Sequence, residues 1–465
     1  MNNKNRLLLG ILALLLAFGA GNGTGAAATK AADKKAAAQT QTKAPIVIEA
    51  DKLYFSDLTG DLFAQGNVQV TQDQDKLFAA LVQGNTKQGE VWVDGKATLV
   101  QPEAKLTGQK IRYNYQQKNG TIQNAAGTIG NERVSAQNIQ ILPNEMILHD
   151  GTMTKCPAQV PDYHISADKV EIWPGEKMIA YNAKFWIKDK VIFSLPKYQK
   201  SLRKKDSQSE FPRVGYYSED GFYIKQYLET PVTENVAAFA DLAYYTKSGF
   251  KPAFGLIDRE KSYTFTVVDG DYRDSDGNWI KKEPEFKLDL GSRRLGSLPV
   301  SYSFYALYGK WTDDYKSSWH QDYNLYFSRD PIKLDPSLNL YLGTGIEQVH
   351  ESYDGSTQNI YKFDATLAKT WSPRLSLWVG YHYTRNNATL FDYERTDLAK
   401  ELDTGFSYRM DRLNAISFNQ SYDLNNNRVY DQDITWHRNL HCWEAAITYR
   451  IKRQQIVFDI NTVKW

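Results

Sequence analysis

The stretch VIEADKLYFSDLTGDLFAQGNVQV (residues 47–70) contains the structural unit that organises the first part of the chain. A short apolar run, Leu53–Phe55, is followed by the turn residues Thr59 and Gly60 and then by a longer run, Leu62–Val70. Apolar and polar residues alternate along the longer run, which is typical of a β-strand with one buried face. Two such runs around a turn predict a hairpin. The side chains expected on its buried face are Leu62, Ala64, Val68 and Val70.

The same unit recurs four more times before residue 190. Asp51 of the first copy corresponds, at spacings of 29, 29, 28 and 31 residues, to Ala80, Gln109, Gln137 and Asp168. One hairpin cannot bury its apolar face alone, but five stacked hairpins can, as a β-jellyroll or a solenoid. We therefore predict such a domain over residues 46–190. Its interior is either filled by its own side chains or open as an apolar trough for acyl chains, and the repeats do not decide between these.

A second pattern runs from Phe211 to Trp465 and has no helical periodicity. Its short runs place aromatic and aliphatic residues on one face and polar residues on the other, as in Val300–Tyr308. This alternation indicates a transmembrane antiparallel β-barrel of about 16 strands. A soluble β-sandwich gives the same alternation, but a meander of 255 residues with this aromatic content exceeds an ordinary sandwich. The predicted fold class is therefore all-β, with a jellyroll followed by a barrel.

The N-terminus predicts export. A basic start and an apolar run, Leu7–Ala20, precede small residues, so residues 1–28 read as a signal peptide. The run is shorter than the roughly 20 residues that a membrane helix needs. Residues 29–45 lack the apolar content to fold and are expected to form a flexible tether. The junction and first barrel strand are expected at 191–220, and the barrel at 221–465.

Composition and motifs argue against several other functions. A net charge of +2 gives no reason to expect a nucleic-acid partner. His437 and His441 lie four residues apart, but on a predicted turn and without the glutamate of a metalloprotease helix. No GxSxG nucleophile motif occurs. We therefore predict no enzyme, no catalytic residues, no metal and no cofactor.

Two segments carry a resemblance to a known family. EADKLYFSDLTGDLFAQGNVQV (49–70) resembles the OstA-type β-jellyroll of lipopolysaccharide-transport proteins. CPAQVPDYHISADKVEIWPGEKMIAYNAKFWIKDKVIFSLPKY (156–198) is similar to the segment that joins this domain to the barrel in the LptD (OstA) family. The resemblance covers about residues 46–231 and the late stretch HRNLHCWEAAITYR (437–450). It identifies the chain as a short-barrel member of that family.

The resemblance implies an outer-membrane translocon with its N-terminal domain in the periplasm. A periplasmic OstA-type bridge protein would deliver lipopolysaccharide, a lipid A glycolipid, to the jellyroll. The barrel, inserted by the barrel-assembly machinery, would open sideways and release the glycolipid into the outer leaflet. Familiar members have a longer barrel and more cysteines, so pore width and the presence of a lipoprotein plug are not transferred. Trp465 ends the last strand as barrel-assembly signals do, although Asp459 and Asn461 on the same face weaken that match.

The resemblance also implies roles for particular residues. Cys156 and Cys442, the only two cysteines, match the family's interdomain disulfide, with two unpaired thiols as the alternative. Pro196 and Pro212 match the prolines of the lateral gate, where a missing amide donor thins the strand pairing. A basic cluster could contact lipid A phosphates or could simply be a solvated loop. Its members are Lys197, Lys200, Arg203, Lys204 and Lys205.

Two other functions stay open at this point. A passive porin or polysaccharide-export channel with an accessory periplasmic domain predicts a fully hydrogen-bonded barrel seam and an inward constriction loop. A soluble exported glycan-binding protein predicts no lipid-facing belt. The translocon predicts an open, apolar jellyroll interior and a weakly paired seam between the first and last barrel strands.

Overall fold

The computed structural model describes residues 45–203, 209–385 and 389–462 of the chain. The predicted signal peptide (1–28), the tether up to residue 44, Lys204, Lys205 and Trp465 lie outside the described residues. The all-β prediction is confirmed, because the described elements are 30 strands and one short 3-10 helix. Residues 46–465 form one compact unit. Across the described ranges, no helix has the length and apolar character needed to cross a membrane.

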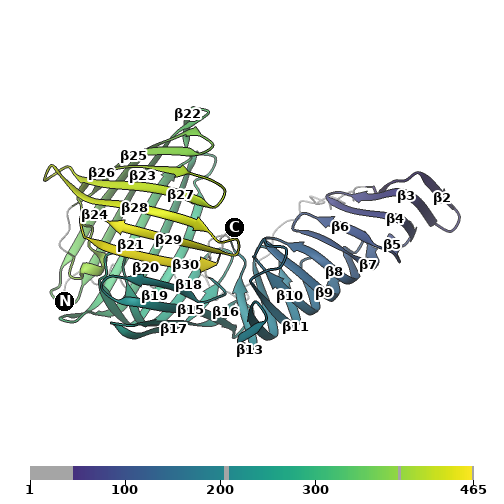
Figure 1. The fold of residues 1–465 in the computed structure, drawn as a ribbon, viewed down its shortest axis with the longest axis horizontal. Helices are drawn as coiled ribbons and strands as arrows, with labels where there is room; N and C mark the ends of the chain where they lie inside the picture. The colour runs from purple at the N-terminus through teal and green to yellow at the C-terminus, as the bar shows by residue number, and fades with distance from the viewer. Residues whose placement is uncertain (1–44, 204–208, 386–388, 463–465) are drawn as a thin grey trace, which may run out of the picture. The chain divides into compact units, whose positions relative to one another are not determined.

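The first sheet contains 13 strands that follow the repeats. Successive long strands pair antiparallel from β3 to β13, and β1 and β2 both pair with β3. In Figure 1 the purple to blue strands form the stacked rungs of this jellyroll. The strands are β1 (Val47–Glu49), β2 (Lys52–Phe55), β3 (Asp61–Gln72), β4 (Asp75–Asn85), β5 (Glu90–Val93), β6 (Ala97–Gln101), β7 (Ala104–Asn114), β8 (Asn119–Ile129), β9 (Glu132–Ile141), β10 (Met146–Thr154), β11 (Tyr163–Trp173), β12 (Lys177–Ile187) and β13 (Lys190–Ser201).

Irregular positions inside these strands let the sheet bend around its core. The β3–β4 pairing shifts register between Gln65 and Val68, as at a β-bulge, which bends and twists a strand. Asparagine and aspartate tolerate the left-handed backbone conformation better than most residues. Four such residues, with φ of 44°, 46°, 48° and 54°, are Asn67, Asn124, Asp150 and Asn182. Each lies within a long strand of a different hairpin, so the rungs bend at similar places.

The jellyroll interior is filled by its own side chains. The residues expected on the buried face of the first unit are at most 6% exposed, so that prediction is confirmed for Leu62, Ala64, Val68 and Val70. Buried residues from every later rung join the same core cluster. The open apolar trough that the translocon interpretation predicted is therefore closed by packing, because the small and branched side chains of facing rungs interdigitate.

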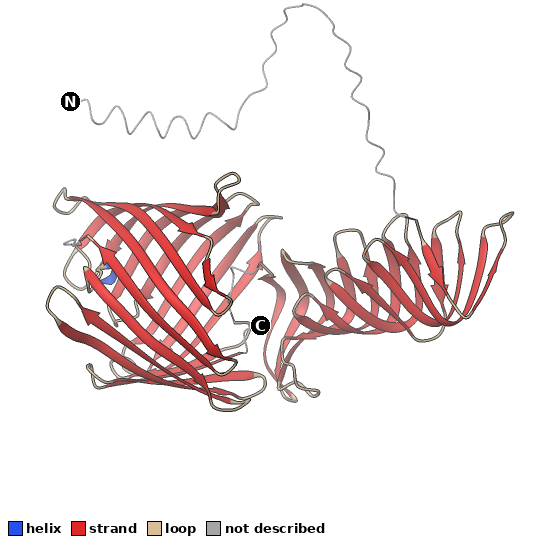
Figure 2. Ribbon diagram, turned by 90° about the horizontal axis from the view of Figure 1, so that it is seen from above, coloured by secondary structure: helices blue, strands red, loops and turns tan. Residues whose placement is uncertain are grey.

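The second sheet closes into a barrel, as predicted. Among the described residues sixteen strands form the ring, since β21 pairs directly with β23 and the short β22 pairs with β23 alone (Figure 2). The elements are β14 (Arg213–Tyr217), β15 (Gly221–Pro231), β16 (Val236–Tyr245), β17 (Gly249–Arg259), β18 (Thr264–Arg273), β19 (Trp279–Arg294), β20 (Val300–Thr312), β21 (Ser317–Arg329), β22 (Ile332–Asp335), β23 (Leu338–Glu351), β24 (Thr357–Ser372), β25 (Leu375–Thr384), η1 (Asp392–Glu394), β26 (Lys400–Arg409), β27 (Asn414–Asp423), β28 (Arg428–Asn439), β29 (Trp443–Arg450) and β30 (Gln455–Thr462).

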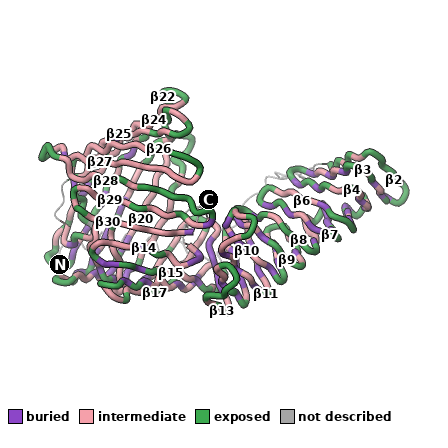
Figure 3. Tube along the Cα trace, viewed as in Figure 1, coloured by how far each residue is buried: buried purple, intermediate pink, exposed green. Residues whose placement is uncertain are grey.

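The two faces of the barrel wall differ as the alternation predicts. On β20, Tyr308 is 44% exposed, whereas Leu307 and Trp311 on the opposite face are buried. Other large apolar side chains point outward in the same way, among them Phe254, Tyr341, Ile346 and Tyr449. Figure 3 shows the barrel strands mostly as intermediate or exposed. An apolar outer face and a polar lumen are what a membrane-spanning barrel needs.

One disulfide joins the two sheets. Cys156, just after β10, is bonded to Cys442 in the β28–β29 turn, and both residues are fully buried. Because turns alternate between the ends of an antiparallel ring, Cys442 defines the jellyroll end of the barrel. The β14–β15, β18–β19 and β29–β30 turns then lie at the opposite end, called the far end below.

The disulfide closes a loop with a sequence separation of 286 residues. In the chain-entropy model such a cross-link contributes on the order of 5 kcal/mol, an upper figure. We expect Cys156→Ser and Cys442→Ser each to lower the midpoint of thermal unfolding. On a non-reducing denaturing gel each variant should migrate more slowly than the wild-type chain. Adding reductant should remove that difference, and equal mobility without reductant would show that the bond does not form.

Candidate functional site

The weakest pairing in the barrel ring is the seam between its first and last strands. β14 pairs with β30 at only four positions, from Val214–Ile460 to Tyr217–Val457. By comparison, β29 and β30 pair at eight positions. Pro212 precedes β14 and has no backbone amide to donate, so the strand begins only at Arg213. The seam has the fewest paired positions of any joint of the ring, and the β14–β15 joint follows with five.

Side chains reinforce the seam on the lumen side. Tyr223 of β15, Gly215 of β14 and Asp459 of β30 lie in one row of the sheet. The Tyr223 ring crosses over Gly215, and its hydroxyl donates to the Asp459 carboxylate on the other side of the seam. A Cβ at position 215 would lie 2.4 Å from the Tyr223 hydroxyl, so only glycine leaves room for this contact. Arg213 adds an ion pair of 3.4 Å with Asp459.

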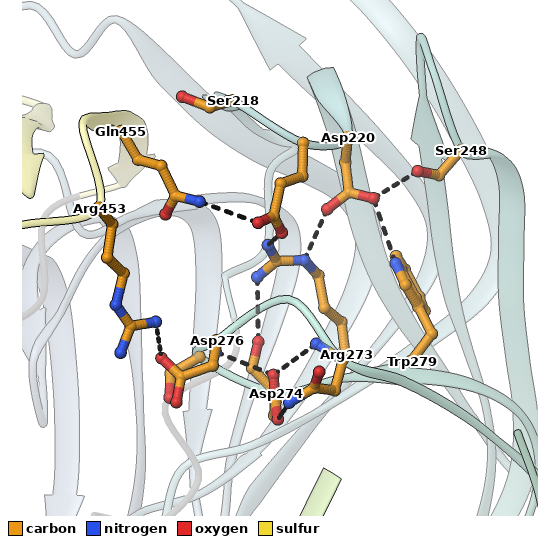
Figure 4. Close-up of polar contacts among 12 residues, drawn as sticks. Ser218, Asp220, Ser248, Arg273, Asp274, Asp276, Trp279, Arg453 and Gln455 are labelled. Atoms are coloured by element: carbon orange, nitrogen blue, oxygen red, sulfur yellow. Dashed lines mark hydrogen bonds and ion pairs between the residues drawn. The ribbon is translucent and has the colours of Figure 1, made fainter. Parts of the chain in front are cut away.

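A polar network closes the far end of the seam (Figure 4). The Ser218 hydroxyl accepts from the Ile456 amide at 3.0 Å, and Gln455 donates to Glu219 at 2.8 Å. Both contacts link the β14–β15 turn to the start of β30, so they cross the seam directly. We call this set, Ser218, Glu219, Gln455 and Ile456, the far-end clasp.

Arginines surround the far-end clasp and connect it to other turns. Arg273 binds Asp220 at 2.7 Å and Glu219 at 3.6 Å, and its guanidinium lies over the Tyr217 ring. Asp220 also accepts from Ser248 and from the Trp279 indole (Figure 4). These contacts join the β14–β15 turn, on the β14 side of the seam, to the β16–β17 turn, the β18–β19 turn and the start of β19.

The jellyroll end of the seam is held by the disulfide and by aromatic packing. Phe211, just before Pro212, lies 4.6 Å from Tyr163 of the jellyroll and 6.5 Å from Trp443 of β29, measured between ring centroids. The Ser209 hydroxyl is 3.0 Å from that of Thr462, at the end of β30. The chain thus passes from jellyroll to barrel through a packed aromatic cluster beside the seam.

The predicted gate prolines lie in different sheets. Pro212 stands beside the seam, as described above. Pro196 is exposed and belongs to β13, which pairs with β12 in the jellyroll sheet. The first sheet therefore extends to Ser201, beyond the boundary expected at residue 190. The run 190–201 alternates like any edge strand, so its pattern alone does not reveal which sheet it joins.

The described members of the predicted basic cluster are also separated. Lys197 lies over the Tyr181 ring, and Arg203 donates to the backbone carbonyls of Arg259 and Glu260 in the barrel. Lys200 is buried in the junction, with Glu132 at 2.7 Å and Glu210 in direct contact. Burial lowers the pKa of Lys200 to about 8, although the nearby Glu132 opposes that shift. The charge of Lys200 is thus compensated inside the protein.

Described residues of the barrel line a polar cavity at each end of the lumen. At the jellyroll end, a cavity of about 870 Å³ lies between the β11–β12 turn of the jellyroll and the barrel wall. Its lining includes Arg203, Lys261, Tyr263, Lys287 and Asp289. At the far end, a cavity of about 240 Å³ is lined by Asp397, Glu401, Tyr430, Asp431, Asp433 and Arg453, among others. Neither is lined as a nucleophile or metal site, and the described part of the chain holds no cluster of three or more potential metal ligands.

The β25–β26 connection folds inward at the far end. Phe391 is 1% exposed and packs on Trp311, a lumen-facing residue of β20. Tyr393 contacts the same indole edge-on, and Lys316 donates to the Leu390 carbonyl. Figure 2 shows the single helical turn of this connection at that end of the barrel. We call residues 389–398 the inward loop.

Sequence reasoning missed the residues that hold the seam. Tyr223, Gly215 and Asp459 are far apart in the chain and meet only once the ring is closed. The one available signal was Asp459, which follows the apolar run Ile456–Phe458 in the terminal strand. The far-end network left no motif, because its members lie in four unrelated turns.

Part of the chain is similar to known proteins. Residues 47–146 match the family described as "LptA/(LptD N-terminal domain) LPS transport protein". The LPS-assembly protein LptD of Pseudoalteromonas atlantica is 26% identical over 198 residues, which are 41% of this chain and 26% of that protein. LptD of Bordetella pertussis is 29% identical over 217 residues, which are 44% of this chain and 27% of that protein. These matches confirm the predicted resemblance to LptD proteins.

These matches are limited in extent. The chain spans about a quarter of the length of the relatives it matches. Among solved structures, a bacterial polysaccharide outer membrane secretin aligns with a TM-score of 0.33 and 11% identity, over 54% of this chain and 97% of that chain. A porin mutant from Rh. blastica aligns with a TM-score of 0.31 and 8% identity, over 55% and 97%. Scores this low carry no argument about function.

The buried Lys200 gives a pH prediction. Its folded-state pKa of about 8 lies below the ordinary value of 10.5. Between these pH values the unfolded chain binds more protons at this site, so stability rises with pH across that window, by about 3 kcal/mol at most. We expect the unfolding temperature of wild type, relative to that of Lys200→Met, to increase from pH 8 to 10.5. At pH 7 the variant should be less stable, because Glu132 and Glu210 lose their buried partner. Parallel pH profiles would contradict the assignment.

Proposed function

We propose that this chain, a member of the LptD family, is an outer-membrane translocon for lipopolysaccharide. The jellyroll receives the glycolipid in the periplasm, and the barrel releases it sideways into the outer leaflet. The single observation that carries the proposal is the seam. It is the shortest backbone pairing in the ring, and it lies beside the point where the jellyroll enters the barrel.

The two chemical parts of lipopolysaccharide need different routes through the protein. Acyl chains need an apolar route, which the jellyroll core and the outer face of the barrel supply. Sugars and phosphates need a polar route, which the lumen supplies. Opening four paired positions and the Asp459 contacts would join the two routes at the jellyroll end. No bond of the substrate changes, so the proposal assigns no catalytic residue, metal or cofactor.

Individual residues take roles on this basis. Pro212 would limit the seam by shortening β14, whereas Pro196 lies in β13 of the jellyroll sheet and would act on the gate from that side. Arg203 donates to carbonyl oxygens rather than to carboxylates, so those contacts leave its positive charge available to lipid A phosphates. Lys197, Lys204 and Lys205 belong to the same proposed contact, whereas the charge of Lys200 is already compensated.

The proposed partners follow from the same reading. A periplasmic OstA-type protein would extend the sheet at its N-terminal strands, where Leu53, Tyr54 and Phe55 are about half exposed. The barrel-assembly machinery would insert the barrel. The inward loop occupies part of the lumen at the far end, so a lipoprotein plug is not required to narrow it.

A second function, a passive porin or polysaccharide-export channel, is favoured by one observation. An inward loop that narrows the lumen is what a constricted channel would have, and Phe391 and Leu398 are buried there. The short seam favours the translocon instead, since a permanent channel gains nothing from a weak joint. The two functions make opposite predictions for glycolipid transport.

Depletion of the protein tests the function directly. We expect surface lipopolysaccharide, labelled on intact cells, to fall while new glycolipid accumulates in the inner membrane and periplasm. Re-expression of the wild-type chain should restore surface labelling. Normal surface lipopolysaccharide after depletion, together with reduced uptake of small solutes, would favour the porin and overturn the proposal.

Locking the seam tests the lateral route. Val214 and Ile460 are partners across the seam, so the pair Val214→Cys/Ile460→Cys should cross-link there. The pair Ile447→Cys/Phe458→Cys joins β29 to β30 and serves as the matched control, because it does not cross the seam. We expect the first pair to block surface delivery when oxidised and to restore it on mild reduction. Delivery that continues through a locked seam would rule the route out.

A further inference from the structure

The inward loop and the far end of the seam share one side chain, Arg453. This residue lies in the β29–β30 turn, two residues before Gln455 of the far-end clasp. Its guanidinium contacts Asp276 at 2.5 Å, Asp431 at 2.8 Å and Asp397 at 3.7 Å. Asp397 belongs to the inward loop, so one arginine ties the loop to the strand that forms the second side of the seam.

Asp276 extends the connection to the first side of the seam. It lies in the β18–β19 turn, where its backbone amide donates to Asp274. Arg273, at the start of the same turn, also donates to the Asp274 carbonyl and binds Asp220 and Glu219 across from it (Figure 4). The contacts therefore run without a break from the loop, through two turns, to both strands of the seam.

The other end of the loop is anchored on the opposite wall. Phe391 and Tyr393 pack on Trp311 of β20. Asn278, which donates to the Asp392 carbonyl, lies instead in the β18–β19 turn with Asp276. In ring order β20 lies far from the seam on both sides. A loop held on Trp311 at one end and on Arg453 at the other spans the far end of the lumen.

We infer that the inward loop is a plug coupled to the seam, so that the far mouth of the lumen and the lateral gate open together. The inference rests on the proposed lateral opening. When the loop leaves Trp311, Arg453 loses Asp397, and the ion pairs that steady the far-end clasp weaken. When the seam opens, the β29–β30 turn moves and withdraws Arg453 from the loop. By linkage the effect acts equally in both directions.

The coupling has a use in moving a glycolipid. A sugar portion that enters the lumen needs room at the far end while the acyl chains leave through the seam. A plug that moved independently would leave the lumen open to small solutes whenever it moved. A plug that moves only with the seam opens the lumen only while cargo passes.

The test uses the full-length protein, with its native disulfide, in vesicles and planar bilayers of phosphatidylethanolamine and phosphatidylglycerol. Channel conductance reports the plug. The extent of cross-linking of the Val214→Cys/Ile460→Cys pair in a fixed time reports a closed seam. Phe391→Ala removes the aromatic anchor, which lies far from the seam, and Asp397→Asn removes the ionic link. Tyr315→Ala is the control, because Tyr315 lies in the far-end β20–β21 turn and is 89% exposed.

We expect Phe391→Ala to raise conductance and to lower seam cross-linking about fivefold, the lower range of coupling between linked sites. Asp397→Asn should also lower cross-linking. Combined, the two changes should lower it no further than Phe391→Ala alone, because both remove the same connection. Tyr315→Ala should change neither readout. Higher conductance with unchanged cross-linking in Phe391→Ala would make the loop an independent constriction and overturn the coupling. Unchanged cross-linking in Asp397→Asn would likewise overturn it.

The assay contains no lipopolysaccharide, so its result is separate from that of depletion. The coupling can fail while surface delivery still depends on the protein. A porin, in turn, would give the conductance change without any change at the seam.

Discussion

Backbone amides and carbonyls cannot be left unpaired in a lipid bilayer, and this constraint governs the barrel. A ring of strands satisfies it only when its first and last strands meet. Here that final joint depends on a strand of five residues, β14, limited by Pro212 at one end and by the turn at Ser218 at the other. The backbone contribution to closure is therefore the smallest that the ring contains. The remainder comes from Tyr223, Arg213 and Asp459 in the lumen and from the far-end clasp. Water can replace side-chain contacts in a polar lumen, whereas lipid cannot replace backbone contacts in the wall.

The two ends of the seam are held by different kinds of interaction. The jellyroll end has a buried disulfide and an aromatic cluster, which do not respond to charge. The far end has hydrogen bonds and ion pairs, several of them on partly exposed side chains, where each contact is of modest strength. A seam built in this way yields first at the far end while the jellyroll stays attached. In the proposed translocation, the jellyroll would therefore stay attached to the start of the barrel while the seam opens.

The sequence predicted the local features of this fold well. The alternation of apolar and polar residues is a local property of the sequence. It therefore predicted both the buried face of the first repeat and the outward face of β20. The number of strands followed, because each strand leaves its own alternating run. What the sequence could not supply was which distant strands meet. The family resemblance predicted Pro196 and Pro212 as a pair of gate residues, and only the pairing of β13 with β12 shows that Pro196 belongs to the jellyroll sheet. Tyr223 with Asp459 and Arg453 with Asp397 are contacts across the ring, and nothing local marks them.

The sequence also could not predict whether the jellyroll interior is filled or open, and the reason is energetic. The core consists mainly of alanine, valine, leucine and isoleucine, which suit either a self-packed interior or an acyl-binding trough. An empty trough would lose packing contacts along its whole length and is therefore unfavourable. A domain that carries acyl chains only transiently should close over its own side chains between cargoes, and the observed interior is closed. Each methylene that enters regains about 0.8 kcal/mol by leaving water, which can offset the parting of the rungs. A closed interior is therefore compatible with the proposed transport, in which the cargo itself would supply the opening.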